Sequence, residues 1–148
     1  MRNLSIISIA IVLLTACSGP APKKNVESAA EIVSLSKQSF LAKVYNYEKN
    51  DSWVYEGSKP CIIDFYADWC APCRKVAPIL KELAATYTDD IVVYKIDVDA
   101  EEELAALFGI QSIPALLFVP MDGEPQMLVG LRDKSELAER IDVMLSAK

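Results

Sequence analysis

The chain has 148 residues, of which 15 are Lys or Arg, 21 are Asp or Glu and none is His, and this length suits a single domain with a sizeable core. The net charge of −6 argues against nucleic-acid binding, which needs a basic surface, and does not support electrostatic docking on anionic lipid. The lack of histidine excludes histidine-based acid–base catalysis and histidine-containing zinc sites.

The first segment is typical of an export signal. Arg2 supplies a positive charge, and the apolar run over residues 4–14 is shorter than the ~20 residues that a membrane-spanning helix needs. Small residues precede Cys17, which resembles the lipobox of bacterial lipoproteins, where cleavage occurs before a cysteine whose sulfur carries diacylglycerol. We predict a lipoprotein signal peptide over 1–16 and a lipidated Cys17. The alternative is an ordinary secretory signal in which Cys17 has no role.

Residues 17–30 contain two prolines and no apolar period, so we expect the lipidated cysteine and a flexible tether there, followed by one domain over 31–148. Several acyl chains would anchor the protein stably. These features predict a lipid-anchored protein of a bacterial cell envelope, facing the periplasm.

Apolar patterning predicts alternating strands and helices from residue 31 onward. The continuous apolar run at 61–67 is typical of a strand buried on both faces, and the 3.6-residue period at 76–87 is typical of a helix with one packed face. The expected elements are strands over 31–35, 61–67, 91–98, 115–119 and 126–129, and helices over 37–47, 76–87, 101–108 and 134–147.

Early alternation implies parallel strands with crossover helices, and the late pair of strands around Asp122 and Gly123 is a hairpin signal. We therefore predict an α/β fold with a mixed central β-sheet flanked by helices on both faces. Residues 48–59, with Trp53 and Tyr55, are expected to form a loop with a short edge strand. Packing over a sheet edge is favoured there over a partner surface.

Cys70 and Cys73 lie where a buried strand meets a helix. Two cysteines with this spacing can close a small disulfide, and the helix N-terminus favours the thiolate of Cys70. We expect an exposed Cys70 to attack substrate disulfides and Cys73 to resolve the mixed disulfide. A structural disulfide and half of a metal site are the alternatives, but the chain has no second CxxC and no histidine to complete a metal site. We therefore predict neither a metal nor another cofactor.

Three other features are candidates for this site: Asp64, Lys95 and the Ile113–Pro114 bond. Asp64 is the charged residue in the apolar strand run, so its burial should be costly and should raise its pKa. It could accept the proton of Cys73, or it could point to solvent at the strand end. Lys95, in the next strand, could pair with Asp64 or extend into water. A cis bond at Pro114 would leave the backbone of Ile113 free to pair with a substrate strand, although most such bonds are trans.

The stretch from Ile62 to Pro78, IIDFYADWCAPCRKVAP, resembles the active-site segment of the thioredoxin family. The resemblance covers residue 31 to the end and implies the thioredoxin fold, protein-disulfide reduction and a cis bond before Pro114. The family's catalytic positions fall on Cys70, Cys73, Asp64 and Lys95, and its helix-kinking proline on Pro78. Residues matching its substrate-binding surface are Trp69, Ala71, Pro72, Ile113, Pro114 and Gly130.

The chain departs from the family pattern at Ala71, where glycine is usual, at Tyr66, where tryptophan is common, and at Ser112, where glycine is common. We expect these changes to affect the shape of the groove and not the chemistry. Cys61 begins the active-site strand, and we expect a buried, inert thiol there.

The resulting hypothesis is a thiol–disulfide oxidoreductase, monomeric, that acts on the disulfides of exported proteins and contributes to cell redox homeostasis. In an oxidising compartment it needs an electron source, for which a membrane thiol shuttle is the expected partner. One alternative is a dedicated reductase of cytochrome c or another apoprotein, although the insertion common in such enzymes is missing between Cys73 and Pro114. Another is a peptide-binding lipoprotein whose cysteines are secondary.

Overall fold

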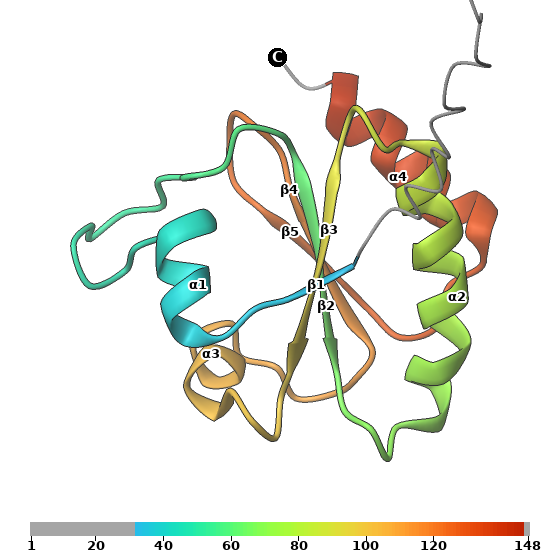
Figure 1. The fold of residues 1–148 in the computed structure, drawn as a ribbon, viewed down its shortest axis with the longest axis horizontal. Helices are drawn as coiled ribbons and strands as arrows, with labels where there is room; N and C mark the ends of the chain where they lie inside the picture. Colours follow the sequence, from blue (N-terminus) through green and yellow to red (C-terminus); the bar gives the residue numbers. More distant parts are fainter. Residues whose placement is uncertain (1–31, 147–148) are drawn as a thin grey trace, which may run out of the picture.

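A five-stranded sheet organises the computed structural model, which describes residues 32–146. Its strands are β1 (Val33–Ser34), β2 (Cys61–Tyr66), β3 (Val92–Asp97), β4 (Ala115–Val119) and β5 (Gln126–Val129). Figure 1 labels the strands, whose order is β1-β3-β2-β4-β5; β3 runs parallel to β1 and β2, and β4 pairs antiparallel with β2 and β5. The predicted mixed sheet is confirmed.

Strand β2 lies at the centre of the sheet because its side chains are buried on both faces. It pairs with β3 on one edge and with β4 on the other. Successive side chains of a strand point to opposite faces. Cys61, Ile63 and Phe65 therefore enter one hydrophobic cluster, and Ile62 enters the other. The end of β2 leads directly into the segment that carries the cysteine pair.

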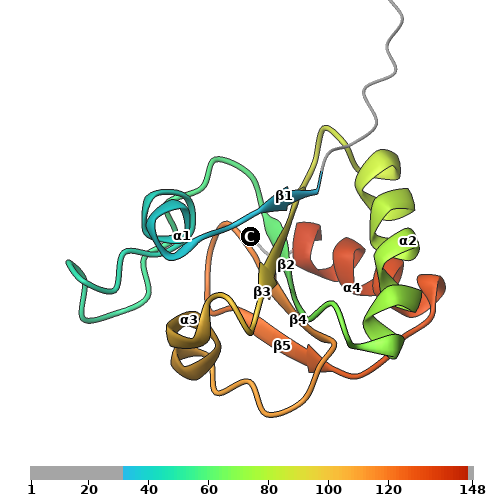
Figure 2. The same cartoon turned by 60° about the horizontal axis from the view of Figure 1, so that its bottom comes forward.

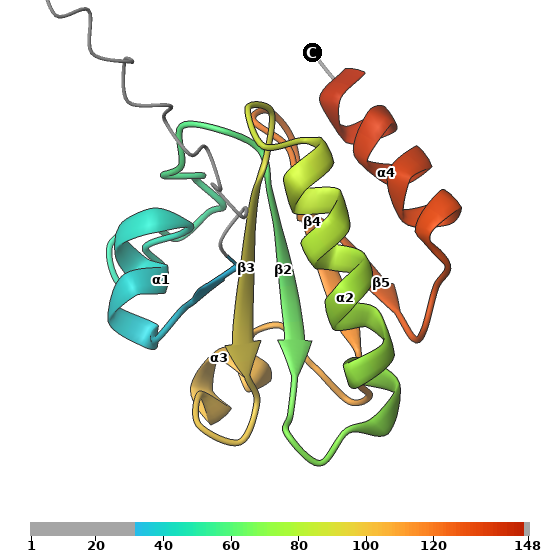
Figure 3. The same ribbon diagram turned by 45° about the vertical axis from the view of Figure 1, so that its right-hand side comes forward.

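Two helical layers cover the sheet, as Figure 2 shows. Helices α1 (Lys37–Lys43) and α3 (Glu102–Leu107) cover one face. Helices α2 (Ala71–Thr86) and α4 (Lys134–Ser146) lie side by side on the other (Figure 3). The apolar periods predicted these layers, because the buried residues of α2 and α4 recur at helical spacing. These residues are Val76, Leu80, Leu83, Leu137 and Ile141.

The connection between α1 and β2 differs from the prediction. Helix α1 ends at Lys43, short of the predicted end at residue 47, because Val44 leaves the helical conformation (φ −123°, ψ −66°). Tyr45 then forms an isolated bridge with Tyr55. The ring of Trp53 packs against that of Tyr45, with centroids 4.8 Å apart, and lies within the α1/α3 layer. The aromatic residues of this connection therefore pack against the hydrophobic cluster that lies between the sheet and helices α1 and α3.

No helix within residues 32–146 is long and apolar enough to cross a membrane. The predicted signal peptide, the lipidated Cys17 and the tether lie outside the described residues. Those assignments stay predictions.

Candidate active site

The cysteine pair lies in the turn that joins β2 to α2. Ala67 accepts a backbone hydrogen bond from Cys70 (3.1 Å), which closes the turn. Cys70 is the N-cap residue of α2, and its Sγ accepts a hydrogen bond from the backbone N–H of Cys73 (3.2 Å). Pro72 occupies the first turn of the helix, where its missing N–H has no intrahelical partner to lose. The sequence thus places the first cysteine at a helix N-terminus, as predicted.

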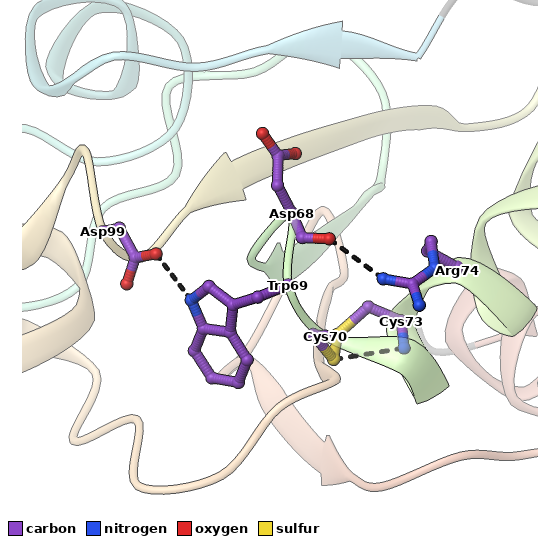
Figure 4. The surroundings of a disulfide bond; sticks show 6 residues. All are labelled: Asp68, Trp69, Cys70, Cys73, Arg74 and Asp99. Carbon is purple, nitrogen blue, oxygen red and sulfur yellow. Dashed lines mark hydrogen bonds between the residues drawn. A yellow bond between two sulfur atoms is a disulfide. The ribbon is translucent and has the colours of Figure 1, made fainter.

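Cys70 and Cys73 are joined by a disulfide bond in this structure (Figure 4). Their Cα atoms lie 5.3 Å apart, a separation that one turn of helix provides without displacement of the backbone. The structure therefore describes the protein with its cysteine pair in the oxidised, disulfide-bonded state.

The predicted exposure of Cys70 is wrong for this oxidised form. Both Cys70 and Cys73 are only 3% exposed. The bond turns the two sulfurs toward each other, and Ala67 and Ile113 pack against the pair. The disulfide nevertheless lies at the rim of the domain, because the adjacent Trp69 is 68% exposed and Ala71 and Pro72 are exposed as well.

Asp64 is buried on the α2 side of the sheet, with 5% of its surface exposed, so of the two alternatives that the sequence left open it does not point to solvent. It lines a cavity of about 740 Å³ that also reaches Cys73. Its Oδ1 atom has no hydrogen-bond partner among the described residues. Burial raises the pKa of Asp64 to about 7, and the positive charge of Lys95 opposes this rise. A carboxyl group with this pKa exchanges its proton near neutral pH, beside the inner cysteine.

Lys95 is the register partner of Asp64 across β2 and β3, but the ion pair, one of the two arrangements that the sequence left open, is not formed. Within residues 32–146, no ammonium–carboxylate contact of 4.0 Å or less joins them. The Lys95 Nζ atom lies instead over the ring of Tyr66, 5.3 Å from its centroid. The aromatic face thus provides an alternative binding position for the ammonium.

The predicted substrate-binding residues meet around the disulfide. The Ile113–Pro114 peptide bond is cis, as the resemblance implied, and Ile113 packs against the cysteines. Gly130 donates a backbone hydrogen bond to the Pro114 carbonyl (2.8 Å), and its positive φ of 94° favours glycine at this position. The exposed Val129 and Leu131 flank Gly130. Together these residues supply an apolar rim next to the redox pair.

Sequence reasoning missed two contacts of this site. The Trp69 indole N–H donates to the carboxylate of Asp99 (2.7 Å), which orients the exposed ring (Figure 4). No sequence signal distinguishes Asp99 from other loop acids. In the sequence, Tyr66 stands out only as a departure that affects the shape of the groove, and its contact with Lys95 is the second missed contact. The available signal was its spacing, since a residue two positions after Asp64 shares that face of β2.

Cys61 is buried and free, as predicted. It lies at the start of β2, on the face covered by α1 and α3. Burial raises the pKa of the Cys61 thiol to about 12. Because the thiolate is the reactive form of cysteine, this residue is chemically silent at neutral pH. Elsewhere in residues 32–146, no three His, Cys, Asp or Glu side chains gather closely enough to hold a metal ion.

Comparisons with known proteins agree with this geometry. Residues 31–143 match the family model described as Thioredoxin. The chain is 42% identical over 98 residues to a thioredoxin of Borreliella burgdorferi, covering 66% of this chain and 84% of that one. It is 38% identical over 98 residues to a thioredoxin of Alicyclobacillus acidocaldarius, covering 66% of this chain and 93% of that one. The solved structure of chloroplastic thioredoxin z, 22% identical, shares the fold with a TM-score of 0.65 over 77% of this chain and 94% of that one.

Proposed function

This chain belongs to the thioredoxin family and is a thiol–disulfide oxidoreductase, and we propose that it uses Cys70 and Cys73 to reduce disulfides in exported proteins. One observation carries this proposal: a disulfide at the N-terminus of α2 lies beside an exposed apolar rim and a buried carboxyl group. A structural disulfide would need neither neighbour.

The reaction begins with the reduced pair. The helix N-terminus stabilises the Cys70 thiolate, which attacks one sulfur of the client disulfide. The Cys70–client bond forms as the client disulfide breaks, and the first client sulfur leaves as a thiolate that takes a proton from water. Cys73 then loses its proton to the Asp64 carboxylate, directly or through water in the cavity that both residues line. Its thiolate attacks the Cys70 sulfur, closes the Cys70–Cys73 disulfide and releases the second client thiolate.

Client recognition is assigned to the rim around the disulfide. The exposed Trp69 ring and the exposed Val129 and Leu131 offer apolar contacts. Next to them, the backbone of Ile113 can pair with an extended client segment, as edge strands do. Ala71 and Pro72, which are exposed in the first turn of α2 between the two cysteines, are assigned to the same surface. Lys95 acts indirectly, through its charge on Asp64.

The place of action is proposed from the amino-terminal sequence. An apolar signal that ends before Cys17 supports a lipid anchor in a bacterial envelope, with the domain facing the periplasm. Thiols in that compartment become oxidised, so the pair needs repeated reduction. A membrane thiol shuttle is the proposed donor, and the domain works as a monomer.

Trapping of the intermediate tests the chemistry. Cys73→Ser protein should accumulate a mixed disulfide with insulin through Cys70, because the resolving thiol is missing. Cys70→Ser protein is the matched control and should trap nothing. Neither variant should catalyse insulin reduction by dithiothreitol, whereas the unmodified chain should. If Cys70→Ser keeps its activity in cells, the chain is a binding module and not a reductase.

Lipid attachment is tested separately. Cells that express the full chain are grown with radioactive palmitate and separated into membrane and soluble fractions. The unmodified chain should carry label and sediment with membranes, and Cys17→Ala should be unlabelled and soluble. Label that persists in Cys17→Ala would contradict the anchor without affecting the redox assignment.

A further inference from the structure

The cavity beside the disulfide contains a contact that the steps above leave without a role. The Lys95 ammonium lies over the Tyr66 ring, 5.3 Å from its centroid. Lys95 is also the register partner of Asp64 on the adjacent strand. One ammonium therefore lies within reach of two groups that attract it: an aromatic face and a carboxylate.

The geometry shows which of the two groups holds the ammonium. Tyr66 follows Asp64 by two positions on β2, so both side chains project from the same face of the sheet. Both line the cavity with Lys95. The ammonium occupies the ring face, and the Oδ1 atom of Asp64 is left without a partner among the described residues. Tyr66 and Asp64 thus compete for the same positive charge.

We propose that Tyr66 is a positioning residue whose ring holds the Lys95 ammonium away from the Asp64 carboxylate, and that it thereby sets the pH range in which Asp64 accepts the Cys73 proton. This inference rests on the proton-acceptor role proposed above for Asp64. No bond to Tyr66 forms or breaks in the reaction. Its effect is electrostatic, because a closer ammonium would stabilise the ionised carboxylate and lower the pH at which the proton leaves.

The other charged or titratable groups that line this cavity are Asp68 in the loop after β2 and Cys73, Arg74 and Lys81 on α2. From β3, the carboxylate of Asp97 also acts on Tyr66, whose pKa is raised first by burial and then by this charge. The Arg74 guanidinium donates to the backbone carbonyl of Asp68 (3.0 Å), and Arg74 and Lys81 are both exposed on α2. Burial raises the pKa of Tyr66 itself, so its hydroxyl stays neutral through the pH range of interest. The Lys95 ammonium is therefore the charge whose position the Tyr66 ring determines.

The test follows the resolving step as a function of pH. The reduced protein is mixed in a stopped-flow instrument with an aromatic disulfide whose thiolate is coloured. The first coloured thiolate reports attack by Cys70, and the second reports resolution by Cys73. The rate of the second phase, measured from about pH 5 to about pH 9, gives a midpoint for the proton acceptor.

Comparison of Tyr66→Leu with Tyr66→Phe separates the effect of the aromatic ring from the effect of the hydroxyl group. Tyr66→Leu removes the aromatic face, so the ammonium can approach Asp64, and the midpoint should fall by about one pH unit. Tyr66→Phe keeps the face and should leave the midpoint unchanged. Tyr66→Trp, which strengthens the attraction for a cation, should raise it and serves as the decisive variant if Tyr66→Leu does not fold. A midpoint that stays constant, or that rises in Tyr66→Leu, would overturn the proposal.

The Tyr66→Leu substitution is also tested in protein that lacks the Lys95 ammonium. In Lys95→Met protein, addition of Tyr66→Leu should cause no further shift, because no ammonium remains to be released. A full shift in that background would show that Tyr66 acts by another route, and the proposal would be wrong.

Asp64→Asn distinguishes failure of this inference from failure of the proposed mechanism. It should abolish the midpoint assigned to the acceptor. If the midpoint survives Asp64→Asn, the acceptor role fails and the inference fails with it. If the midpoint is lost in Asp64→Asn but does not move in Tyr66→Leu, only the role of Tyr66 fails.

Discussion

The two faces of the sheet are packed in different ways, although β2 contributes alternate residues to both. On the face covered by α1 and α3, the ring of Phe108 packs against those of Phe40 and Phe65, with centroids 5.6 and 5.5 Å apart. On the face covered by α2 and α4, the hydrophobic packing ends in a cavity of about 740 Å³ that reaches Asp64. One face is closed by aromatic side chains, and the other is open beside the cysteine pair.

This difference predicts that Cys61, at the start of β2, and Cys73, in the first turn of α2 after the other end of β2, differ in reactivity. Cys61 lies at the start of the strand on the closed face, where burial raises its pKa to about 12. Cys73 follows the strand at the other end and borders the cavity, next to a carboxyl group that can take its proton. The reactivity of a thiol in this fold therefore depends on the face and the strand end at which it lies.

The closed face should show the largest stability effect. Phe40 is fully buried, so Phe40→Ala should lower the free energy of unfolding by about 4 kcal/mol through lost burial and the cavity that remains. Trp69→Ala, at an exposed aromatic residue, is the control and should change it by less than about 1 kcal/mol. Urea denaturation of the oxidised proteins measures both. Equal losses in the two variants would contradict the contrast between a packed and an exposed aromatic side chain.

On the open face, Asp64→Asn should change the free energy of unfolding by a smaller amount and in the opposite direction, as an increase. Burial raises the pKa of Asp64 from 3.8 to about 7, so the folded protein holds a proton that the unfolded chain releases between these values. The free energy of unfolding of the unmodified chain should therefore fall as the pH rises from about 4 to about 7, and then level off. A pKa shift of this size corresponds to a change of about 4 kcal/mol in the free energy of unfolding. The cavity beside Asp64 is partly open to solvent, which makes the expected change smaller.

At about pH 8 we therefore expect Asp64→Asn to be more stable than the unmodified chain by on the order of 3 kcal/mol. At about pH 4 the two proteins should have similar stability, because Asp64 is protonated there. Denaturation at both pH values checks this expectation. A gain that is the same at pH 4 and pH 8 would show that the ionised carboxylate is not its cause.

The smallest effect is expected for Cys61→Ala. Loss of one buried sulfur should cost about 1 kcal/mol, and the reductase activity should be unchanged. In the reduced, folded protein, iodoacetamide should label Cys70 and leave Cys61 unmodified until denaturant is added. Labelling of Cys61 in the folded protein, found by mass spectrometry of the peptides, would show that the closed face opens.

Much of the fold could be predicted because local patterns and tertiary packing agree. The strand limits Ala115–Val119 and Gln126–Val129 match the structure, since apolar runs and a hairpin signal mark both ends. The end of the first helix could not be predicted, because the apolar spacing continues past Lys43 while the bridge between Tyr45 and Tyr55 turns the chain away. That bridge joins residues whose pairing has no local signal.

By itself, the sequence determined the order of elements and the position of Cys70 at a helix start, because these follow from short-range patterns of apolar residues and cysteine spacing. Only the tertiary structure decided that Asp64 is buried, that Lys95 contacts Tyr66 and not Asp64, and that Ile113 packs against the two cysteines. These contacts join separate strands and loops, and they depend on competition between neighbouring groups in space. Such competition has no counterpart in the spacing of residues along the chain.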